Sequence, residues 1–362
     1  MEVTVEFAAP SDDAAIRALL QRQAMPGRVR IAFAREPNFA RGCAVTGDEY
    51  KIVVARAQGE IVGVACRSVR NVFINGHEQR LGYLGQLRVD DRFRGRWLVS
   101  RGFALLGEID RHDPLIYLAS IVDGNHEATG VLVRKGRRSF PNFHEVARYC
   151  TLAIPLTRSR SAGPPSPRFA GRGPSRRRGE GQITAGSLDQ VPEIVRFLRT
   201  EGSRRQLFPV WTEDALRNLD GLDVEDIRVA RRDGGIVGVM ALWDQTAYKQ
   251  SIIRGYSGWM KAVAPFLPRA GHHLRSAYAS LICATDPEEF AELLREIHNL
   301  ARERRFDYLL VGLDARDPLL KVARAYRHYS YPSRLYLASW SNGGSIHDQL
   351  DHRPAYVDIA TL

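Results

Sequence analysis

Residues 80–111 read RLGYLGQLRVDDRFRGRWLVSRGFALLGEIDR, and the rest of the chain is organised around this stretch. Its first ten positions alternate with a period of two, as in a β-strand. The alternating residues are Leu81, Tyr83, Gly85, Leu87 and Val89. An arginine-rich turn around Gly95 follows, and apolar residues then recur at helical spacing from Leu98 to Ile109. The stretch therefore predicts a strand, a turn and a helix.

The start of such a helix suits an anion. The first N–H groups of a helix have no intrahelical partners, and the aligned peptide dipoles make that end positive. Gly95 lets the backbone approach a ligand closely, and Arg92, Arg94 and Arg96 carry guanidinium groups that fit phosphate oxygens. The turn predicts a phosphate site, and a solvated basic turn is the alternative.

Residues 87–103 resemble the acetyl-CoA-binding strand, pyrophosphate loop and helix of the GCN5-related N-acetyltransferase superfamily. Arg94, Gly95 and Arg96 follow Val89 at the distance that the family's motif requires. The chain departs from the motif at Trp97, where glycine is usual, and at Val99, where glycine or alanine is usual. The resemblance implies acetyl-CoA as the co-substrate. It implies that the coenzyme contacts Leu87, Val89, Arg94, Gly95, Arg96, Trp97, Leu98 and Val99.

A second motif lies at residues 125–136, NHEATGVLVRKG. It resembles the segment after the family's fifth strand, with Asn125, Ala128 and Gly136 at the matching spacing, and implies that Asn125 also contacts the coenzyme. Leu132 stands where many relatives have a tyrosine that protonates the departing thiolate. An apolar side chain cannot donate this proton. Water or another residue must therefore supply it, or the chemistry has been lost.

The resemblance implies direct attack of an amine on the bound thioester, with a backbone N–H near Val89 stabilising the oxyanion. Tyr83 occupies the position of a strand carboxylate that acts as the base in several relatives. The reference pKa of tyrosine is high for a base, so a pocket wall is the alternative for Tyr83. Asp123 is the second catalytic candidate, and a helix cap is its alternative. The sequence does not identify the acceptor amine.

The remainder of the first half shows the element order of this superfamily. Residues 25–48 have no clean period, and the resemblance implies that they help to form the acceptor pocket. The pairs Gln58-Gly59 and Asn75-Gly76 predict hairpin turns. Strands are predicted at 2–7, 51–57, 60–68, 115–122 and 148–155, and a helix at 13–20. The strand at 115–122 is continuously apolar, so we expect it to be buried and parallel to the strand ending at Val89.

Strand and helix patterns recur after residue 182 in a similar order. Strands are predicted at 182–184, 227–230, 236–243, 278–284 and 308–313, helices at 187–200 and 287–304, and final elements at 319–326 and 334–340. We therefore expect an α/β fold with mixed sheets, made of two tandem acyl-CoA N-acyltransferase-like domains. The predicted divisions are a first domain at 1–155, a linker at 156–181 and a degenerate second domain at 182–362.

The second copy differs at its strand-to-helix junction, TDPEEF at 285–290. Asp286 is a good N-cap residue and Pro287 suits the first helical position. Glu288 and Glu289 then place carboxylates at the positive end of the helix. These acids would repel a pyrophosphate, so we expect the second copy not to bind coenzyme A there.

The composition of the 362 residues, 44% hydrophobic and 26% charged, is typical of a soluble two-domain protein. No apolar run reaches membrane-spanning length, and the N-terminus has no basic segment leading into an apolar one. We therefore expect a cytoplasmic protein without a membrane partner. The four cysteines lack paired spacing, which predicts structural thiols and no metal site.

Residues 157–181 hold seven arginines and one glutamate, so more than half of the formal net charge of +11 lies there. This composition is typical of a flexible linker. A nucleic-acid-binding arm is the alternative, but Phe169 is the only aromatic residue in the segment, and the linker is favoured.

Three functions follow from these observations. The first is transfer of an acetyl group from acetyl-CoA to an amine of a small molecule or peptide, with the chemistry in the N-terminal domain. The second is a non-catalytic module that binds acyl-CoA, and the third is a nucleic-acid-associated protein that uses the basic linker. The oligomeric state is open between a homodimer and a chain whose sheet edges pair internally.

Overall fold

The computed structural model describes residues 3–24, 29–94, 96–111, 115–133, 140–156, 182–258, 261, 269–340 and 349–362. Three features named above lie outside these ranges: Gly95, Gly136 and residues 157–181 of the predicted linker. The side chain of Arg96 is likewise outside the description.

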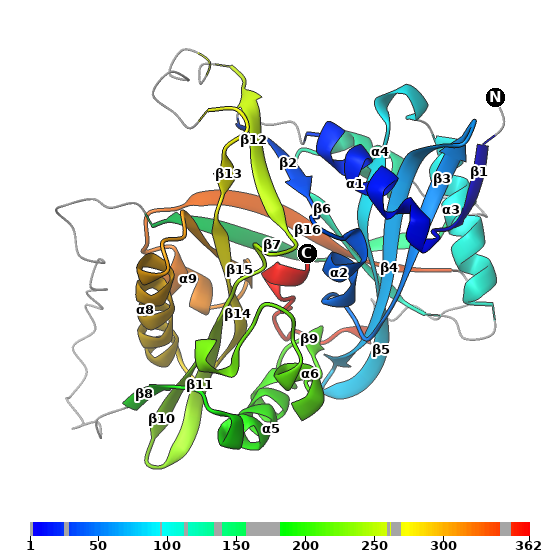
Figure 1. Ribbon diagram of the computed structural model, residues 1–362. Coiled ribbons are helices and arrows are strands. Elements are labelled where there is room, and N and C mark those ends of the chain that lie inside the picture. The colour runs from blue at the N-terminus through cyan, green and yellow to red at the C-terminus, as the bar shows by residue number, and fades with distance from the viewer. Residues whose placement is uncertain are drawn as a thin grey trace.

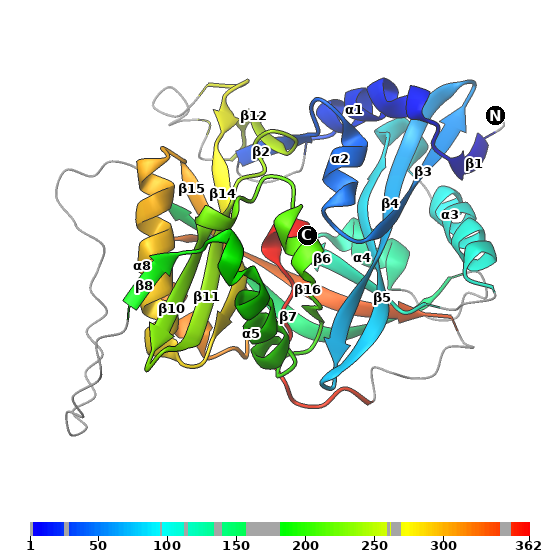
Figure 2. The ribbon, with the colours of Figure 1, turned by 60° about the horizontal axis from the view of Figure 1, so that its bottom comes forward.

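One sheet of thirteen strands runs through the described part of the chain (Figures 1 and 2). The first half supplies β1 (Val3–Phe7), β3 (Glu49–Ala57), β4 (Glu60–Ile74), β5 (His77–Val89), β6 (Tyr117–Val122) and β7 (Asn142–Pro155). The second half supplies β8 (Gln182–Ala185), β9 (Phe208–Pro209), β10 (Ile227–Arg232), β11 (Gly235–Trp243), β14 (Ser276–Ala284), β15 (Tyr308–Asp314) and β16 (Tyr329–Ser339). The strand order is β1-β3-β4-β5-β6-β16-β7-β15-β14-β11-β10-β8, and β9 pairs with β4. The α/β fold with a mixed sheet is confirmed.

The two halves exchange their last strands in the middle of this sheet. The final strand of the chain, β16, lies antiparallel between β6 and β7. The last strand of the first half, β7, pairs in turn with β15 of the second half. Sheet edges of the two halves therefore pair within the chain, as one of the alternatives above expects. The predicted boundaries at 155 and 182 stay a prediction, but each half contains a strand that completes the sheet of the other.

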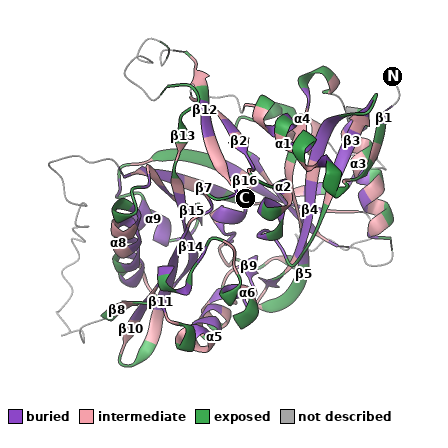
Figure 3. Ribbon diagram, viewed as in Figure 1, coloured by how far each residue is buried: buried purple, intermediate pink, exposed green. Residues whose placement is uncertain are grey.

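Helices cover both faces of the sheet. In the first half, α1 (Asp13–Arg22) and α2 (Phe39–Ala44) pack on one face, and α3 (Arg96–Ile109) and α4 (His126–Leu132) pack on the other. The second half has α5 (Val191–Gly202), α6 (Glu213–Arg217), α8 (Pro287–Glu303) and α9 (Leu319–Ala323). Short 3-10 helices lie at Pro10–Asp12, Asp91–Phe93, Leu188–Gln190, Val224–Asp226 and Ile359–Thr361. Buried residues concentrate in the central strands and on the inner faces of these helices (Figure 3).

A small three-stranded sheet joins the two halves above the main sheet (Figure 1). Its strands are β2 (Val29–Ala34), β12 (Gln250–Tyr256) and β13 (His273–Leu274), and β2 pairs antiparallel with β12. The region 25–48, which showed no period in the sequence, thus contains both β2 and α2. Local pattern missed them because β2 is held by a strand more than 200 residues away and α2 is only six residues long.

Turns and cysteines agree with the sequence. The turns at Gln58-Gly59, Asn75-Gly76 and Asp233-Gly234 all have positive φ at both residues, as the tightest hairpin turns require. All four cysteines are free and buried, which confirms the structural thiols. Within the described residues, no helix is long and apolar enough to cross a membrane.

Candidate active site

The site is built on β5 and β6, which are parallel, as the sequence predicted. Their pairing covers only residues 82–84 of β5 and 117–119 of β6, although both strands continue further. Their carboxyl ends therefore separate. Ligands of α/β sheets bind at such carboxyl ends, where neighbouring strands diverge.

A β-bulge re-aims the last residues of β5. The register between β4 and β5 shifts here, and Gln86 has a φ of 57°. A bulge sets two residues against one and changes the face on which later side chains lie. Tyr83 packs beside the C-terminal segment, whereas Val89 packs with Leu98 of α3 on the opposite face. An unbroken strand would have placed Tyr83 and Val89 on one face.

The second half has the same bulge, but there its backbone groups are occupied. Leu281 in β14 has a φ of 54°, and its N–H donates to a carboxylate oxygen of Asp358 over 3.0 Å. The next N–H, of Ile282, donates to the hydroxyl of Tyr356 over 3.0 Å. In the described part of the chain, no side chain accepts a hydrogen bond from the N–H of Gln86. The two bulges thus have similar backbone conformations. They differ in whether a described side chain accepts a hydrogen bond from the bulge N–H.

Asp358→Ala is expected to lower the free energy of unfolding by about 1–3 kcal/mol, since a buried donor that loses its acceptor costs roughly that much. The variant removes the acceptor for Leu281 and for the hydroxyl of Ser280, which donates to Asp358 over 2.8 Å. Urea unfolding followed by circular dichroism measures the change. Asp223→Ala is the matched control, because Asp223 is exposed and its side chain makes no cap hydrogen bond. Equal losses in both variants would contradict the assignment.

Three exposed apolar side chains lie near the ends of β5 and β6 and at the start of α3. Leu87 near the end of β5 is 39% exposed, Trp97 at the start of α3 is 43% exposed, and Val122 at the end of β6 is 41% exposed. Most large apolar side chains of the described chain are buried, so exposed ones near the ends of these elements are candidates for a contact surface. The Trp97 ring also lies against the Arg101 guanidinium, 5.5 Å from the ring centroid. Leu87 and Trp97 are among the predicted coenzyme contacts.

The loop arginines make exposed ion pairs. Arg94 contacts Asp91 over 2.6 Å and Glu127 of α4 over 2.8 Å, and Arg92 contacts Asp90 over 3.0 Å. Exposed pairs of this kind contribute little to stability, so Arg94 can exchange them for phosphate oxygens at small cost. The phosphate contacts of Arg94, Gly95 and Arg96 stay a prediction.

The other predicted coenzyme contacts differ in what they can offer. Leu98 is buried among Val3, Ala57 and Val62, so its backbone N–H is the part left for a ligand. Val89 packs against the same cluster, and Val99 packs against the cluster that contains Phe103. Asn125 caps α4, accepting from the N–H of Ala128 over 3.0 Å. The roles of these residues in coenzyme binding stay predictions.

The two catalytic candidates have different surroundings. The ring of Tyr83 lies over Gly85, where a Cβ would come within 2.7 Å of it. Burial raises the pKa of Tyr83, which disfavours the phenolate that a base would need. Asp123 accepts from Nε of Arg334 over 2.7 Å, and Arg334 also contacts Glu145. Both assignments stay predictions, and the raised pKa weighs against the one for Tyr83.

Sequence reasoning missed the bulge and a buried arginine beside it. Arg35, directly after β2, donates to the side-chain oxygen of Gln86 over 3.1 Å. It packs over Gly42 of α2, where a Cβ would come within 3.0 Å of it. No local sequence pattern indicates the bulge at Gln86 or the burial of Arg35, because an arginine in a segment without periodicity is expected to be exposed. The only available hint was that region 25–48 was expected near the acceptor.

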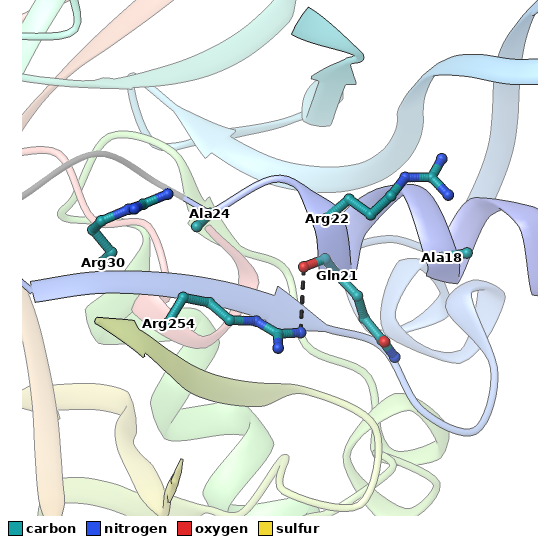
Figure 4. Close-up of a pocket in the computed structure, with 6 residues that line it drawn as sticks. All are labelled: Ala18, Gln21, Arg22, Ala24, Arg30 and Arg254. Atoms are coloured by element: carbon teal, nitrogen blue, oxygen red, sulfur yellow. Dashed lines mark hydrogen bonds between the residues drawn. The ribbon is translucent and has the colours of Figure 1, made fainter. Parts of the chain in front are cut away.

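An open basic groove lies between α1, β2 and β12 (Figure 4). Its volume is about 470 Å³. The lining residues are Ala18, Gln21, Arg22, Ala24, Arg30 and Arg254. Arg254 donates to the backbone oxygen of Gln21 over 3.3 Å. The hydrogen bond from Arg92 is the largest cause of the lowered pKa of Asp90, and the charge of Arg22 is a smaller one. The groove is thus lined by three arginines, one each from α1, β2 and β12.

Several solved structures share this fold. Saccharomyces cerevisiae N-myristoyltransferase with bound myristoyl-CoA superposes with a TM-score of 0.62 at 12% identity, covering 92% of this chain and 82% of that one. A GCN5-related N-acetyltransferase from Sphaerobacter thermophilus gives 0.56 at 14% identity, covering 99% and 98%. A conserved protein from Enterococcus faecalis V583, described as a probable N-acyltransferase, gives 0.52 at 10% identity, covering 94% and 73%.

Neither a family model nor a curated protein sequence matches the chain. The structural likenesses extend over nearly the whole chain, which fits two tandem copies rather than one. The resemblance that the sequence showed is thus confirmed at the level of fold: this chain has the fold of the GCN5-related N-acyltransferases, in a tandem arrangement.

Proposed function

We propose that this protein transfers an acetyl group from acetyl-CoA to an amine, and that the chemistry takes place in the first half. The observation that carries the proposal is the bulge at Gln86, which lies where β5 and β6 separate and has no side-chain acceptor within the described residues. Backbone N–H groups held in this way can donate to the oxyanion that forms when a thioester is attacked.

The chemistry assigned to these residues is direct transfer. The acceptor nitrogen attacks the thioester carbonyl carbon, a carbon–nitrogen bond forms and the carbon–sulfur bond breaks. The nitrogen loses one proton, and the departing thiolate takes one up to leave as the free thiol. The bulge N–H groups stabilise the negative charge on the carbonyl oxygen, and Leu87 and Trp97 contact the apolar arm of the coenzyme. The start of α3 and Arg94 bind its phosphates.

In the second half, the corresponding backbone N–H groups already donate to protein side chains. This supports assigning the chemistry to the first half. Asp286 accepts from the N–H groups of Glu288 and Glu289 over 3.0 and 2.9 Å, and Glu289 is paired with Arg232. The start of α8 is therefore satisfied by the protein itself, like the bulge at Leu281. A diphosphate would have to displace Asp286 from these N–H groups and approach the buried Glu289.

Binding of acetyl-CoA without turnover is the second candidate. Leu132, at the position of the missing tyrosine acid, packs against the apolar cluster of α3 and β6. No proton donor is available from this position. Release of free thiol across a panel of amines distinguishes the candidates, because a binding module releases none.

Leu87→Glu is expected to raise the dissociation constant of acetyl-CoA at least about tenfold, because a carboxylate at this position would have to be desolvated beneath the bound coenzyme. Leu87 is exposed, so the substitution should leave folding unchanged. Isothermal titration calorimetry measures the affinity. Leu188→Glu is the matched control, since Leu188 is 60% exposed and lies in the second half. An unchanged affinity in Leu87→Glu would count against this site.

A further inference from the structure

Three cations gather where the two halves meet, beside the bulge. Arg35 follows β2, Arg88 lies in β5 and Lys249 precedes β12. Arg35 is 4% exposed and is tied to Gln86 by its hydrogen bond. Because the bulge shifts the alternation, Arg88 lies on the face of Tyr83 rather than the face of α3.

These three cations lack acidic partners within the described residues. Arg35 donates to the backbone oxygen of Ala34 and to Gln86, Arg88 to the oxygen of Leu87, and Lys249 to the oxygen of Ala360. No carboxylate of the described chain is within ion-pair distance of any of them. Arg35 is buried and Arg88 and Lys249 are half-buried, and a charge withdrawn from water without a counter-charge is costly. The arrangement is therefore electrostatically incomplete.

Their mutual repulsion is part of that cost. Burial, followed by the charge of Arg35, lowers the pKa of Arg88 to about 10 and that of Lys249 to about 7. The carboxylate whose charge acts on Lys249 is Asp358, which is already bonded to Ser280 and Leu281. Tyr278, whose ring lies 4.6 Å from the Lys249 ammonium, contributes no full charge.

The basic groove continues this cluster toward solvent. Arg30 and Arg254 lie on β2 and β12, the same two strands that lead to Arg35 and Lys249. Arg22, the last residue of α1, also lines the groove, and its side chain extends away from Arg30 and Arg254 (Figure 4). Within the described chain none of these three arginines forms an ion pair, although the charge of Arg22 acts on Asp90. Cations thus follow the strand pair that joins the two halves, from the open groove to the bulge.

We propose that the acceptor is an amine that carries a carboxylate, such as an acidic amino acid or the N-terminus of an acidic peptide, with the carboxylate held by Arg35, Arg88 and Lys249. This inference rests on the proposed function, since it assigns the acceptor side of the same site. Guanidinium groups match a carboxylate geometrically, and a cationic acceptor such as a polyamine would be repelled.

The test compares acceptors with the same reacting amine and different charge: Gly-Glu, Gly-Gln-amide and Gly-Lys-amide. With acetyl-CoA and the full chain, kcat/KM for Gly-Glu should exceed that for Gly-Gln-amide by at least about tenfold, because an uncharged analogue leaves the cations unpaired. Arg88→Gln should raise KM for Gly-Glu about tenfold while leaving KM for Gly-Gln-amide and the affinity for acetyl-CoA unchanged.

Further variants guard against a general loss of structure. Arg88→Lys should restore part of the preference for Gly-Glu, and Arg88→Glu should shift it toward Gly-Lys-amide. Arg204→Gln is the control, because this arginine side chain is 74% exposed in the second half. Thermal unfolding of every variant reports whether the fold is intact.

The outcomes separate this inference from the proposed function. A preference for the neutral or cationic peptide would leave the transferase standing and overturn the acidic acceptor. Weakened acetyl-CoA binding in Arg88→Gln would assign the cations to the coenzyme and likewise overturn it. If no peptide is acetylated, calorimetry with Gly-Glu decides: binding that Arg88→Gln weakens supports the carboxylate site, and absence of binding overturns the acidic acceptor. Thiol release across the amine panel then decides the proposed function separately.

Discussion

Residues 1–156 expressed alone are expected to give no folded protein, and residues 182–362 alone are expected to fail as well. Strand β7 finds both of its neighbours, β15 and β16, in the second half. Its residues Tyr149, Leu152 and Ile154 are almost fully buried there. Exposing three such side chains costs roughly 5–9 kcal/mol, which is comparable to the whole stability of a typical domain.

Co-expression should rescue both fragments. A chain cut between residues 168 and 169 still supplies every strand, so the two pieces are expected to co-purify as one particle with a single cooperative unfolding transition. Size-exclusion chromatography and circular dichroism measure the outcome, and the uncut chain is the control. A monomeric fragment 1–156 that unfolds cooperatively would show that the strand exchange is dispensable.

Arg67→Met is expected to lower the free energy of unfolding by about 3–5 kcal/mol, the usual effect of leaving one member of a buried ion pair alone. Arg67 donates to Asp110 over 2.9 Å and to the hydroxyl of Tyr117 over 2.7 Å, and all three residues are buried. Tyr117 also donates to Asp110. Without Arg67, the carboxylate of Asp110 keeps one side-chain partner and no counter-charge.

The same change should reach the candidate site. The Tyr117 ring fills the space beside Gly82, which any Cβ there would overlap, and this residue pair begins the short parallel contact of β5 with β6. Urea unfolding measures the stability, and acetyl-CoA titration measures the site. The double variant Arg67→Met, Asp110→Leu should recover much of the lost stability, because it removes both charges. A single variant as stable as the wild type would refute the cost assigned to the pair.

Local sequence patterns sufficed for the elements that carry their own signals. The hairpin turns required glycine and residues that tolerate positive φ, and Asp286-Pro287 marked the start of α8, where Asp286 accepts two backbone hydrogen bonds. The strand, turn and helix around residues 80–111 likewise followed from a change of period from two to 3.6. Such features depend on residues within one or two turns of each other.

The candidate site was only partly accessible to the same reasoning. Leu87 and Trp97 were expected to contact the coenzyme, and both are exposed. The contact itself stays a prediction. Arg35, Arg88 and Lys249 were not singled out, because they come from distant parts of the chain and meet only through the pairing of β2 with β12 and the bulge in β5. A bulge also inverts which side chains share a face, so alternation alone places Arg88 on the wrong side.

By itself, the sequence determined that two similar α/β units follow one another and that acids stand at the start of α8 in the second. The anion-binding turn of the first unit stays a prediction. Only the tertiary structure decided that β7 and β16 each lie in the sheet of the other half, and that Asp358 accepts from the second bulge. It also decided that, among the described residues, no side chain accepts from the N–H of Gln86 and Arg35 is bonded to its side chain. The physical reason is range: periodicity and caps act between neighbours, whereas strand pairing and buried charge join residues hundreds of positions apart.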